Sequence, residues 1–167
     1  MTRDFPVNKL AETISQHFPQ AVVQATGTSV YLQPDDLRKV TSFLKETPGL
    51  EFSYLVSVTG VDYVEYFELV YHLVSISHNH SAVIKVRVCG REDPIVPSVV
   101  PVWKGADLQE REVYDLMGIH FEGHPNLKRI LLWDEFPGHP LRKDFWYQNP
   151  SIGSRWYETT QKDASQD

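Results

Sequence analysis

The sequence has a single cysteine, Cys89, among its 167 residues. One thiol excludes a disulfide framework within the chain, and it excludes a thiolate cluster for zinc or for an iron–sulfur centre. The sequence also lacks the run of about 20 consecutive apolar residues that a membrane-spanning helix requires. These absences favour a reducing compartment and a chain that reaches a membrane only through its partners.

A basic excess is missing as well. The formal net charge is -6, with 22 acidic and 16 basic side chains, so no positive surplus remains to neutralise the phosphates of a nucleic acid. The first residues, from Met1 to Pro6, lack the apolar stretch of a secretory signal peptide. We therefore expect a chain that is cytosolic or that reaches a membrane only through partners. The length and the hydrophobic content of 41% predict one globular core with room for an extended tail.

Motifs for enzymatic chemistry are absent too. The sequence contains no Gly-x-Ser-x-Gly elbow, no Gly-x-Gly-x-x-Gly turn and no P-loop. The acids Glu110 and Glu112 point to different sides of their helix, so they cannot act on one substrate as a general acid and a general base. The residues predict no catalytic side chain and no cofactor site. What remains is charged and aromatic surface that is suited to binding another protein.

Seven histidines raise a metal site as the alternative. His120 and His124 are four residues apart and His139 follows downstream, but Pro125 disfavours a helix that would hold the first two on one face. No His-Glu-x-x-His pattern is present, and local hydrogen bonding is the commoner role for such histidines. We predict no metal ligand, and a free-standing metal protein that uses these histidines and Cys89 is the competing class.

Hydrophobic periodicity predicts an α+β domain in residues 1–93, with one mixed β-sheet packed with helices. The expected helices cover residues 8–18 and a stretch that Pro34 opens and Pro48 ends. The expected strands are residues 21–26, 29–33, 52–61, 66–77 and 82–88. In the last strand Ala82, Ile84, Val86 and Val88 alternate with polar side chains, so these four residues predict a core face.

The next region, residues 94–145, begins as a proline-containing linker and continues as a charged helix over residues 102–117. At about 100° per residue, the core face of this helix consists of Ala106, Val113, Leu116 and Met117. Asp107, Arg111 and Asp115 lie on the opposite side at intervals of four residues. Arg111 is therefore expected to pair with either acid.

Glu110 projects at the edge of that apolar face. A carboxylate in this position must be paired, hydrogen-bonded or protonated, because burying it alone is too costly. Its neighbour Arg111 points about 100° away and is a poor partner. We therefore expect a cation from elsewhere in the fold, or from another protein, to reach Glu110.

Two similar loops follow the helix, at residues 121–129 and 136–144, and each contains Gly-His-Pro and ends in adjacent cations. Those cations, Lys128, Arg129, Arg142 and Lys143, are the expected donors for the acids of the helix. Between the two arginines we favour Arg142 as the residue that holds the helix to the loops or to a partner. The tail, residues 146–167, is polar with scattered aromatics and is expected to extend over a partner's surface.

The sequence of this region resembles a known family. The segments that carry the resemblance are residues 102–107, 110–119 (EREVYDLMGI), 121–125 (FEGHP), 127–131 (LKRIL) and 138–145 (GHPLRKDF). Over about residues 94 to 146 the chain is similar to the C subunit of NADH:quinone oxidoreductase, respiratory complex I, in its bacterial form. The region before it agrees with that family in length and in element order.

The resemblance implies a non-catalytic subunit in the peripheral arm of a proton-translocating enzyme. FMN and iron–sulfur clusters would lie in partner subunits, which pass electrons from NADH to quinone. The implied partners are the quinone-site D subunit and the terminal-cluster B subunit, on the cytoplasmic side of the cell membrane. Implied interface or structural residues are Glu110, Arg111, Glu112, Asp115, His124, Lys128, Arg129, His139, Arg142, Lys143 and Asp144.

The same family also resembles components of ferredoxin-linked dehydrogenases and of membrane-bound hydrogenases, which remain alternatives. His139 favours the bacterial respiratory form, since plastid-type chains tend to have Trp at this position. The sequence ends at Asp167, so we expect the separate polypeptide rather than the form fused to the D subunit. The electron donor is chosen by other subunits.

Overall fold

The computed structural model describes residues 2–146 of the chain. The first part contains β1 (Arg3–Asp4), α1 (Val7–His17), β2 (Val22–Thr26), β3 (Ser29–Leu32), the 3-10 turn η1 (Pro34–Asp36) and α2 (Leu37–Glu46). Then follow β4 (Tyr54–Asp62), β5 (Tyr66–Ser75), β6 (His80–Cys89), β7 (Ile95–Pro97), α3 (Ala106–Met117) and β8 (His120–Glu122). The expected partner-binding tail lies outside the described residues, apart from Trp146.

The sheet is mixed, and its strands run in the order β2-β3-β6-β5-β4, with β1 added beside β6. β3 and β6 are parallel, whereas β5 is antiparallel to both β6 and β4. The predicted core face of β6 is confirmed, because Ala82, Ile84, Val86 and Val88 are all buried. On the other face Lys85 forms an ion pair of 2.8 Å with Glu68 of β5. The α+β fold class is thus confirmed.

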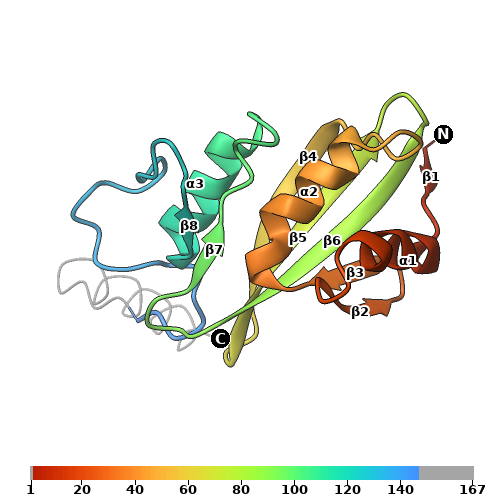
Figure 1. Cartoon of the computed structure of the whole chain (residues 1–167). Helices are drawn as coiled ribbons and strands as arrows, with labels where there is room; N and C mark the ends of the chain where they lie inside the picture. Colours follow the sequence, from red (N-terminus) through yellow and green to blue (C-terminus); the bar gives the residue numbers. More distant parts are fainter. Residues whose placement is uncertain (1, 147–167) are drawn as a thin grey trace, which may run out of the picture.

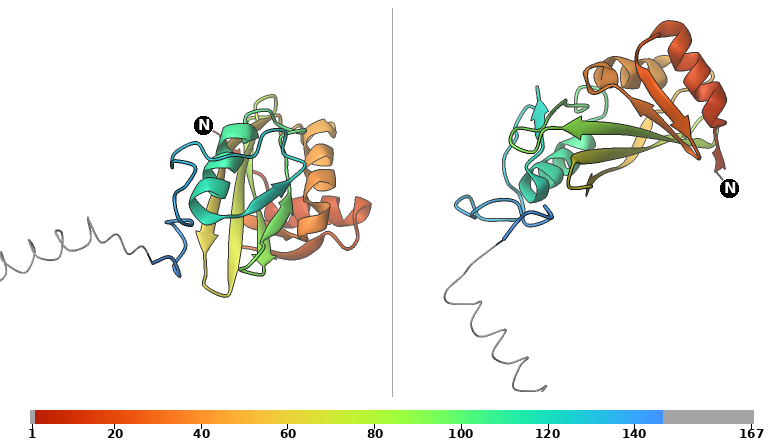
Figure 2. Two further views of the ribbon diagram at one scale, coloured as in Figure 1. Left: turned by 90° about the vertical axis from the view of Figure 1, so that its left-hand side faces the viewer. Right: turned by 90° about the horizontal axis from the view of Figure 1, so that it is seen from below.

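Helices α1 and α2 lie on one side of the sheet (Figures 1 and 2). α1 buries Leu10 and Ile14, which are one turn apart, against the sheet. α2 starts after the 3-10 turn that Pro34 opens, and its buried residues include Leu37, Val40 and Leu44. Both helices end within a residue or two of the expected positions. No helix within residues 2–146 is long and apolar enough to cross a membrane.

Helix α3 packs against β4, the strand at the end of the sheet. The close approach requires a glycine, because a Cβ on Gly60 would lie 2.4 Å from the Met117 sulfur. The side-chain oxygen of Gln109 accepts a hydrogen bond of 2.6 Å from the Val58 amide. This bond satisfies a backbone group at the open edge of the sheet, which otherwise invites unwanted pairing.

Two short strands correct the sequence prediction. Residues 94–101 are not only a linker, since β7 pairs in parallel with β8, with Ile95 opposite His120 and Pro97 opposite Glu122. The charged helix also begins four residues later than expected, at Ala106. The indole nitrogen of the buried Trp103 donates to the Phe52 carbonyl oxygen at 3.1 Å, and this contact holds the chain in a turn before the helix.

An arginine of α2 connects the two parts of the chain. The Arg38 side chain donates to the carbonyl oxygens of Ser98, at 3.0 Å, and Glu122, at 2.8 Å. Both carbonyls belong to the β7–β8 region, which Figure 1 shows beside α3. The segments around α3 are therefore attached to the α+β domain by these two hydrogen bonds from Arg38 as well as by the packing of α3 on β4.

Candidate functional site

The site begins at the C-terminal end of α3, where Gly118 stops the helix. Gly118 has the left-handed φ of 73°, and its amide donates to the Tyr114 carbonyl oxygen at 2.8 Å. A Cβ at this position would also lie 2.5 Å from the His139 ring. The glycine therefore both ends the helix and allows the second loop to approach it.

Glu110 is fully buried, but its partners differ from the expected cation. One carboxylate oxygen accepts from the Ser98 hydroxyl at 2.6 Å, and the other accepts from the Val99 amide at 2.7 Å. Within residues 2–146 no ion pair reaches Glu110. Burial raises the pKa of Glu110 from 4.5 to about 7, although these hydrogen bonds act in the opposite direction.

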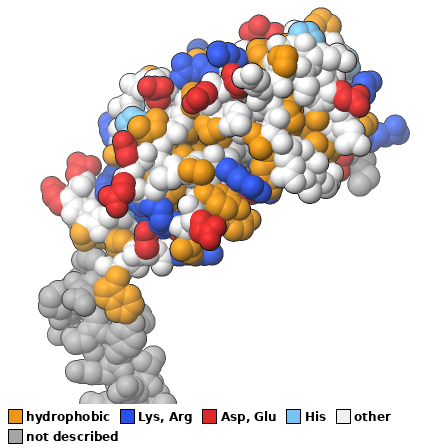
Figure 3. Space-filling view, turned by 60° about the horizontal axis from the view of Figure 1, so that its bottom comes forward, with side chains coloured by type: hydrophobic (Ala, Val, Ile, Leu, Met, Phe, Trp, Pro, Cys, Tyr) orange, Lys and Arg blue, Asp and Glu red, His pale blue; other side chains and the backbone are white. Residues whose placement is uncertain are grey.

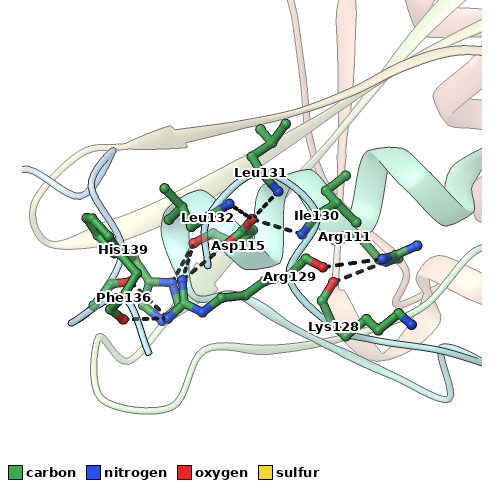
Figure 4. Close-up of polar contacts among 10 residues, drawn as sticks. Arg111, Asp115, Lys128, Arg129, Ile130, Leu131, Leu132, Phe136 and His139 are labelled. Carbon is green, nitrogen blue, oxygen red and sulfur yellow. Dashed lines mark hydrogen bonds and ion pairs between the residues drawn. The ribbon is translucent and has the colours of Figure 1, made fainter. Parts of the chain in front are cut away.

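Asp115 is also fully buried, although it lies on the side of the helix opposite the apolar face. One of its oxygens accepts from the backbone amides of Ile130, Leu131 and Leu132 at 3.0, 2.7 and 3.0 Å. The other oxygen accepts from Arg129 at 2.9 Å (Figure 4). Burial alone would raise the pKa of Asp115, but the three amides and the guanidinium together lower it.

Arg129, rather than the favoured Arg142, holds the second loop to α3. Besides Asp115, its guanidinium donates to the carbonyl oxygens of Phe136, at 3.2 Å, and Gly138, at 3.1 Å (Figure 4). The planar group thereby joins three segments at once, as a guanidinium does better than an ammonium. Nδ1 of His139 lies 2.8 Å from the Asp115 carbonyl oxygen, and burial lowers the pKa of this histidine.

Arg111 serves the first loop rather than Asp115. Its guanidinium donates to the carbonyl oxygens of Lys128, at 3.1 Å, and Arg129, at 3.3 Å, and lies 3.9 Å from Asp107. The His124 side chain is buried beside the same helix, with Nε2 3.2 Å from the Asp107 carbonyl oxygen. The acids and cations near α3 are thus mostly occupied with contacts to the loops.

A second polar cluster was missed by the sequence analysis. Arg91 forms two bonds to the buried Asp62, at 2.7 and 2.9 Å, and a third to Asp144 at 2.9 Å. The Lys143 amide also donates to Asp62 at 2.8 Å. The hydrogen bond from Arg91 holds the pKa of Asp62 well below its usual range. The only sequence signal was an acid at the end of a strand and a cation just after another.

Arg142 belongs to this second cluster. Its guanidinium lies over the Phe67 ring, 5.0 Å from the centroid, and donates to the Arg91 carbonyl oxygen. Beside it a hollow of about 380 Å³ opens, with Arg91, Pro137 and His139 in its wall. Arg142 therefore attaches the second loop to the sheet and not to the helix, while its predicted contact with a partner stays a prediction.

The remaining site residues face outward. Glu112, Lys128 and Lys143 are exposed, and no described side chain pairs with Glu112 through an ion pair. Within residues 2–146 no group of three His, Cys, Asp or Glu side chains is arranged to hold a metal ion. Three large apolar side chains on the loops are more than half exposed: Leu131 at 61%, Trp133 at 57% and Leu141 at 59%. The loops are thus ordered by polar contacts while they present apolar groups to the outside.

These observations define a class of protein in which an α+β domain is extended by a helix–loop unit, here residues 94–145. Buried acids hold the loops of this unit in place, and the loops present apolar side chains outward. The chain belongs to the family described as the respiratory-chain NADH dehydrogenase, 30 Kd subunit, whose sequence model matches residues 30–151. The resemblance to the bacterial C subunit is thereby confirmed.

Individual relatives agree with this membership. The NADH-quinone oxidoreductase C subunit of Azorhizobium caulinodans is 42% identical over 149 residues, which cover 85% of this chain and 70% of that protein. The C subunit of Moorella thermoacetica is 48% identical over 116 residues, covering 68% of this chain and 76% of that protein.

The fold is shared with a solved structure. A chain in the structure of the membrane-bound sulfane sulfur reductase (MBS), an archaeal respiratory membrane complex, matches with a TM-score of 0.68 and 24% sequence identity. The match covers 92% of this chain and 91% of that one. At this level of identity the likeness concerns the fold alone.

Proposed function

We propose that the chain is a non-catalytic subunit in the peripheral arm of a proton-translocating NADH:quinone oxidoreductase. In this role it scaffolds the quinone-site D subunit and the terminal-cluster B subunit on the cytoplasmic side of the membrane. FMN and iron–sulfur clusters in partner subunits carry electrons from NADH to quinone. Membership of the C-subunit family supports this role.

The structural observation that carries the proposal is the helix–loop unit of residues 94–145. Its exposed Leu131, Trp133 and Leu141 are attached to backbone that Asp115 and Arg129 hold in place. Exposed apolar side chains on a preordered backbone favour protein binding, because little conformational entropy is lost on association. The contacts that Asp115, Arg129, His139 and the neighbouring charged residues make support a positioning role for them.

A capture experiment tests the proposal. The tagged full-length chain is recovered from detergent-solubilised membranes of cells that lack the native copy, and bound subunits and NADH:quinone activity are measured. We expect flavin and iron–sulfur subunits to co-purify with that activity. The double variant Trp133→Ser/Leu141→Ser should reduce capture by about tenfold or more, as for central apolar residues of interfaces.

The matched control is Ile76→Ser, which removes a side chain that is 69% exposed in the β5–β6 turn, outside the helix–loop unit. This variant should assemble normally. Recovery of the free chain alone from such membranes would overturn the proposal. Capture of hydrogenase or ferredoxin-linked subunits instead would support the alternative complexes that the family resembles, and would replace the proposed electron donor.

A further inference from the structure

The turn between β4 and β5 contains a strained residue. Val64 has a φ of 73°, in the left-handed region that glycine and asparagine adopt most readily. A β-branched side chain is especially unfavourable there. The Val64 side chain is also 53% exposed, so burial within the chain does not offset the strain. A turn that served only to connect two strands would be better built with glycine.

The surrounding groups hold this strained conformation in place. The Val64 amide donates to the Asp62 carboxylate at 2.7 Å, and the Val64 carbonyl oxygen accepts from Arg91 at 2.7 Å. Asp62 is itself buried and bound to two nitrogens of Arg91 and to the Lys143 amide. Strained backbone that is so fully determined by its neighbours is often found where a protein binds another molecule.

A second exposed side chain accompanies Val64. Tyr63 is 46% exposed, and its ring stacks on Tyr66 with 5.0 Å between the centroids. Stacking orders the tyrosine before any partner arrives, so its apolar surface can be buried with little further loss of entropy. The hairpin tip thus presents two adjacent apolar groups in a fixed arrangement.

The hairpin tip is continuous with the loops that are proposed to bind partner subunits. Arg91 contacts Val64 on one side and Asp144 of the second loop on the other, and it lines the hollow beside Pro137 and His139. Figure 1 shows the hairpin tip next to the segment at the end of the described chain. On the face seen in Figure 3, apolar side chains gather between acidic and basic groups.

We propose that Tyr63 and Val64 form a preordered contact that inserts into an apolar recess on a neighbouring protein of the respiratory complex. Glu65 in this turn is exposed, as are Glu92 and Asp93, which directly follow Arg91 in the chain. Basic side chains therefore border the recess. This inference rests on the proposed function and extends its interface to a hairpin outside the helix–loop unit.

One substitution at Val64 separates the effect of backbone strain on stability from the effect of the side chain on partner binding. Val64→Gly removes the apolar side chain and relieves the backbone strain at the same time. The melting temperature of the isolated chain should therefore rise or stay the same. Binding of the fluorescently labelled full-length chain to membranes that lack it should weaken by about tenfold or more, measured by titration. If the turn has only a structural role, the Val64→Gly variant should bind these membranes as well as the wild type does, or better.

Further variants keep the outcome interpretable. Val64→Asn also tolerates the left-handed backbone and lacks the apolar side chain, so it should weaken binding even if the glycine variant folds poorly. Glu65→Lys should weaken binding by several-fold, on the order of one charge pair at an interface rim. Ile76→Ser should leave binding unchanged. Normal binding by Val64→Gly and Val64→Asn would overturn the inference.

The failure of this inference differs from the failure of the proposed function. If the wild-type chain does not bind the depleted membranes, the proposed function is wrong. If the wild type binds and Trp133→Ser/Leu141→Ser does not, while both Val64 variants bind normally, the hairpin tip alone is excluded from the interface.

Discussion

The sheet and the loop region after α3 are ordered by different forces. In the sheet, Phe67, Leu69 and Leu73 are completely buried, and apolar side chains fill the space beneath two helices. In residues 123–145 the large side chains Leu131 and Trp133 point outward instead. There the order comes from backbone groups that converge on the carboxylate of Asp115 and the guanidinium of Arg129.

This difference teaches where each region is vulnerable. Burial is shared among many side chains, each of which contributes about 1.5–3 kcal/mol. A buried carboxylate that satisfies several donors concentrates comparable energy in one residue, because removing it leaves every donor without a partner. The sheet should therefore respond to substitution as a whole, and the loops should respond locally.

The largest expected effects come from a pair of substitutions that contrast the two regions. Leu69→Ala should lower the free energy of unfolding of the whole domain by about 2–5 kcal/mol. Asp115→Ala should lower the protection of the Ile130, Leu131 and Leu132 amides by about 3–5 kcal/mol, with a smaller change in the melting temperature of the sheet. Amide hydrogen exchange, read residue by residue, measures both.

The control for Asp115→Ala is Glu112→Gln on the same helix, because Glu112 is exposed. This substitution should change the free energy of unfolding and the protection of the loop amides by less than about 0.5 kcal/mol. Equal loss of protection in the loops and in the sheet after Asp115→Ala would contradict the comparison. The loops would then be part of the same cooperative unit as the core.

The next effect concerns Glu110, where the two regions meet. Its pKa is about 7 in the folded chain, above the ordinary 4.5, so its contribution to stability is complete below about pH 4.5 and is lost as the pH rises through 7. The glutamine of Glu110→Gln cannot titrate, and its side-chain oxygen can still accept the hydrogen bond from the Val99 amide. The pH-dependent part of the stability difference between wild type and variant should reach roughly 3 kcal/mol between these limits.

Denaturant unfolding at a series of pH values from about 4 to 8 measures this difference. The wild type should lose stability relative to Glu110→Gln as the pH rises, and Glu112→Gln should run parallel to the wild type. A difference that stays constant with pH would mean that Glu110 remains charged at low pH, as the cation expected from the sequence would have required.

The smallest effect is a gain in stability within the sheet. The Tyr71 hydroxyl is buried and has no hydrogen-bond partner within residues 2–146. Tyr71→Phe should therefore raise the free energy of unfolding by about 1 kcal/mol, because an unpaired polar group no longer has to be desolvated. Tyr54→Phe, at an exposed position, is the control and should change little. A loss of stability in Tyr71→Phe would contradict this prediction. It would show that a polar contact of the Tyr71 hydroxyl helps to stabilise the sheet, which the comparison attributes to apolar burial.

Periodicity predicted the sheet well because burial on one face leaves a regular pattern. The alternation of apolar residues from Ala82 to Val88 and the apolar stripe of α2 both arise because one side of each element faces the core. The strands β7 and β8 left no such record, since each has three residues and β7 ends in a proline. Their paired residues are 25 positions apart in the chain, and Arg38 contacts the pair from 60 and 84 residues away, so no local pattern encodes this pairing.

The sequence indicated most of the residues that meet around α3, but it did not indicate the contacts between them. The helical wheel placed Asp115 opposite the core face of α3, but it could not show that the loops cover that side and bury the residue. Glu110 was expected at the edge of the core, and its burial agrees, yet a hydroxyl and an amide satisfy it in place of a cation. Which donor reaches a buried acid depends on tertiary packing, and loops without periodicity do not reveal it.

The contacts of Asp115 also imply an order of events during folding. Its partners, from Arg129 to Leu132, lie 14 to 17 residues further along the chain. The attachment of the second loop to the sheet, from Lys143 to Asp62, spans 81 residues. Closing a short loop is faster and loses less entropy than closing a long one. We therefore expect the loops to gather around α3 early, and to join the hairpin only once the sheet has formed.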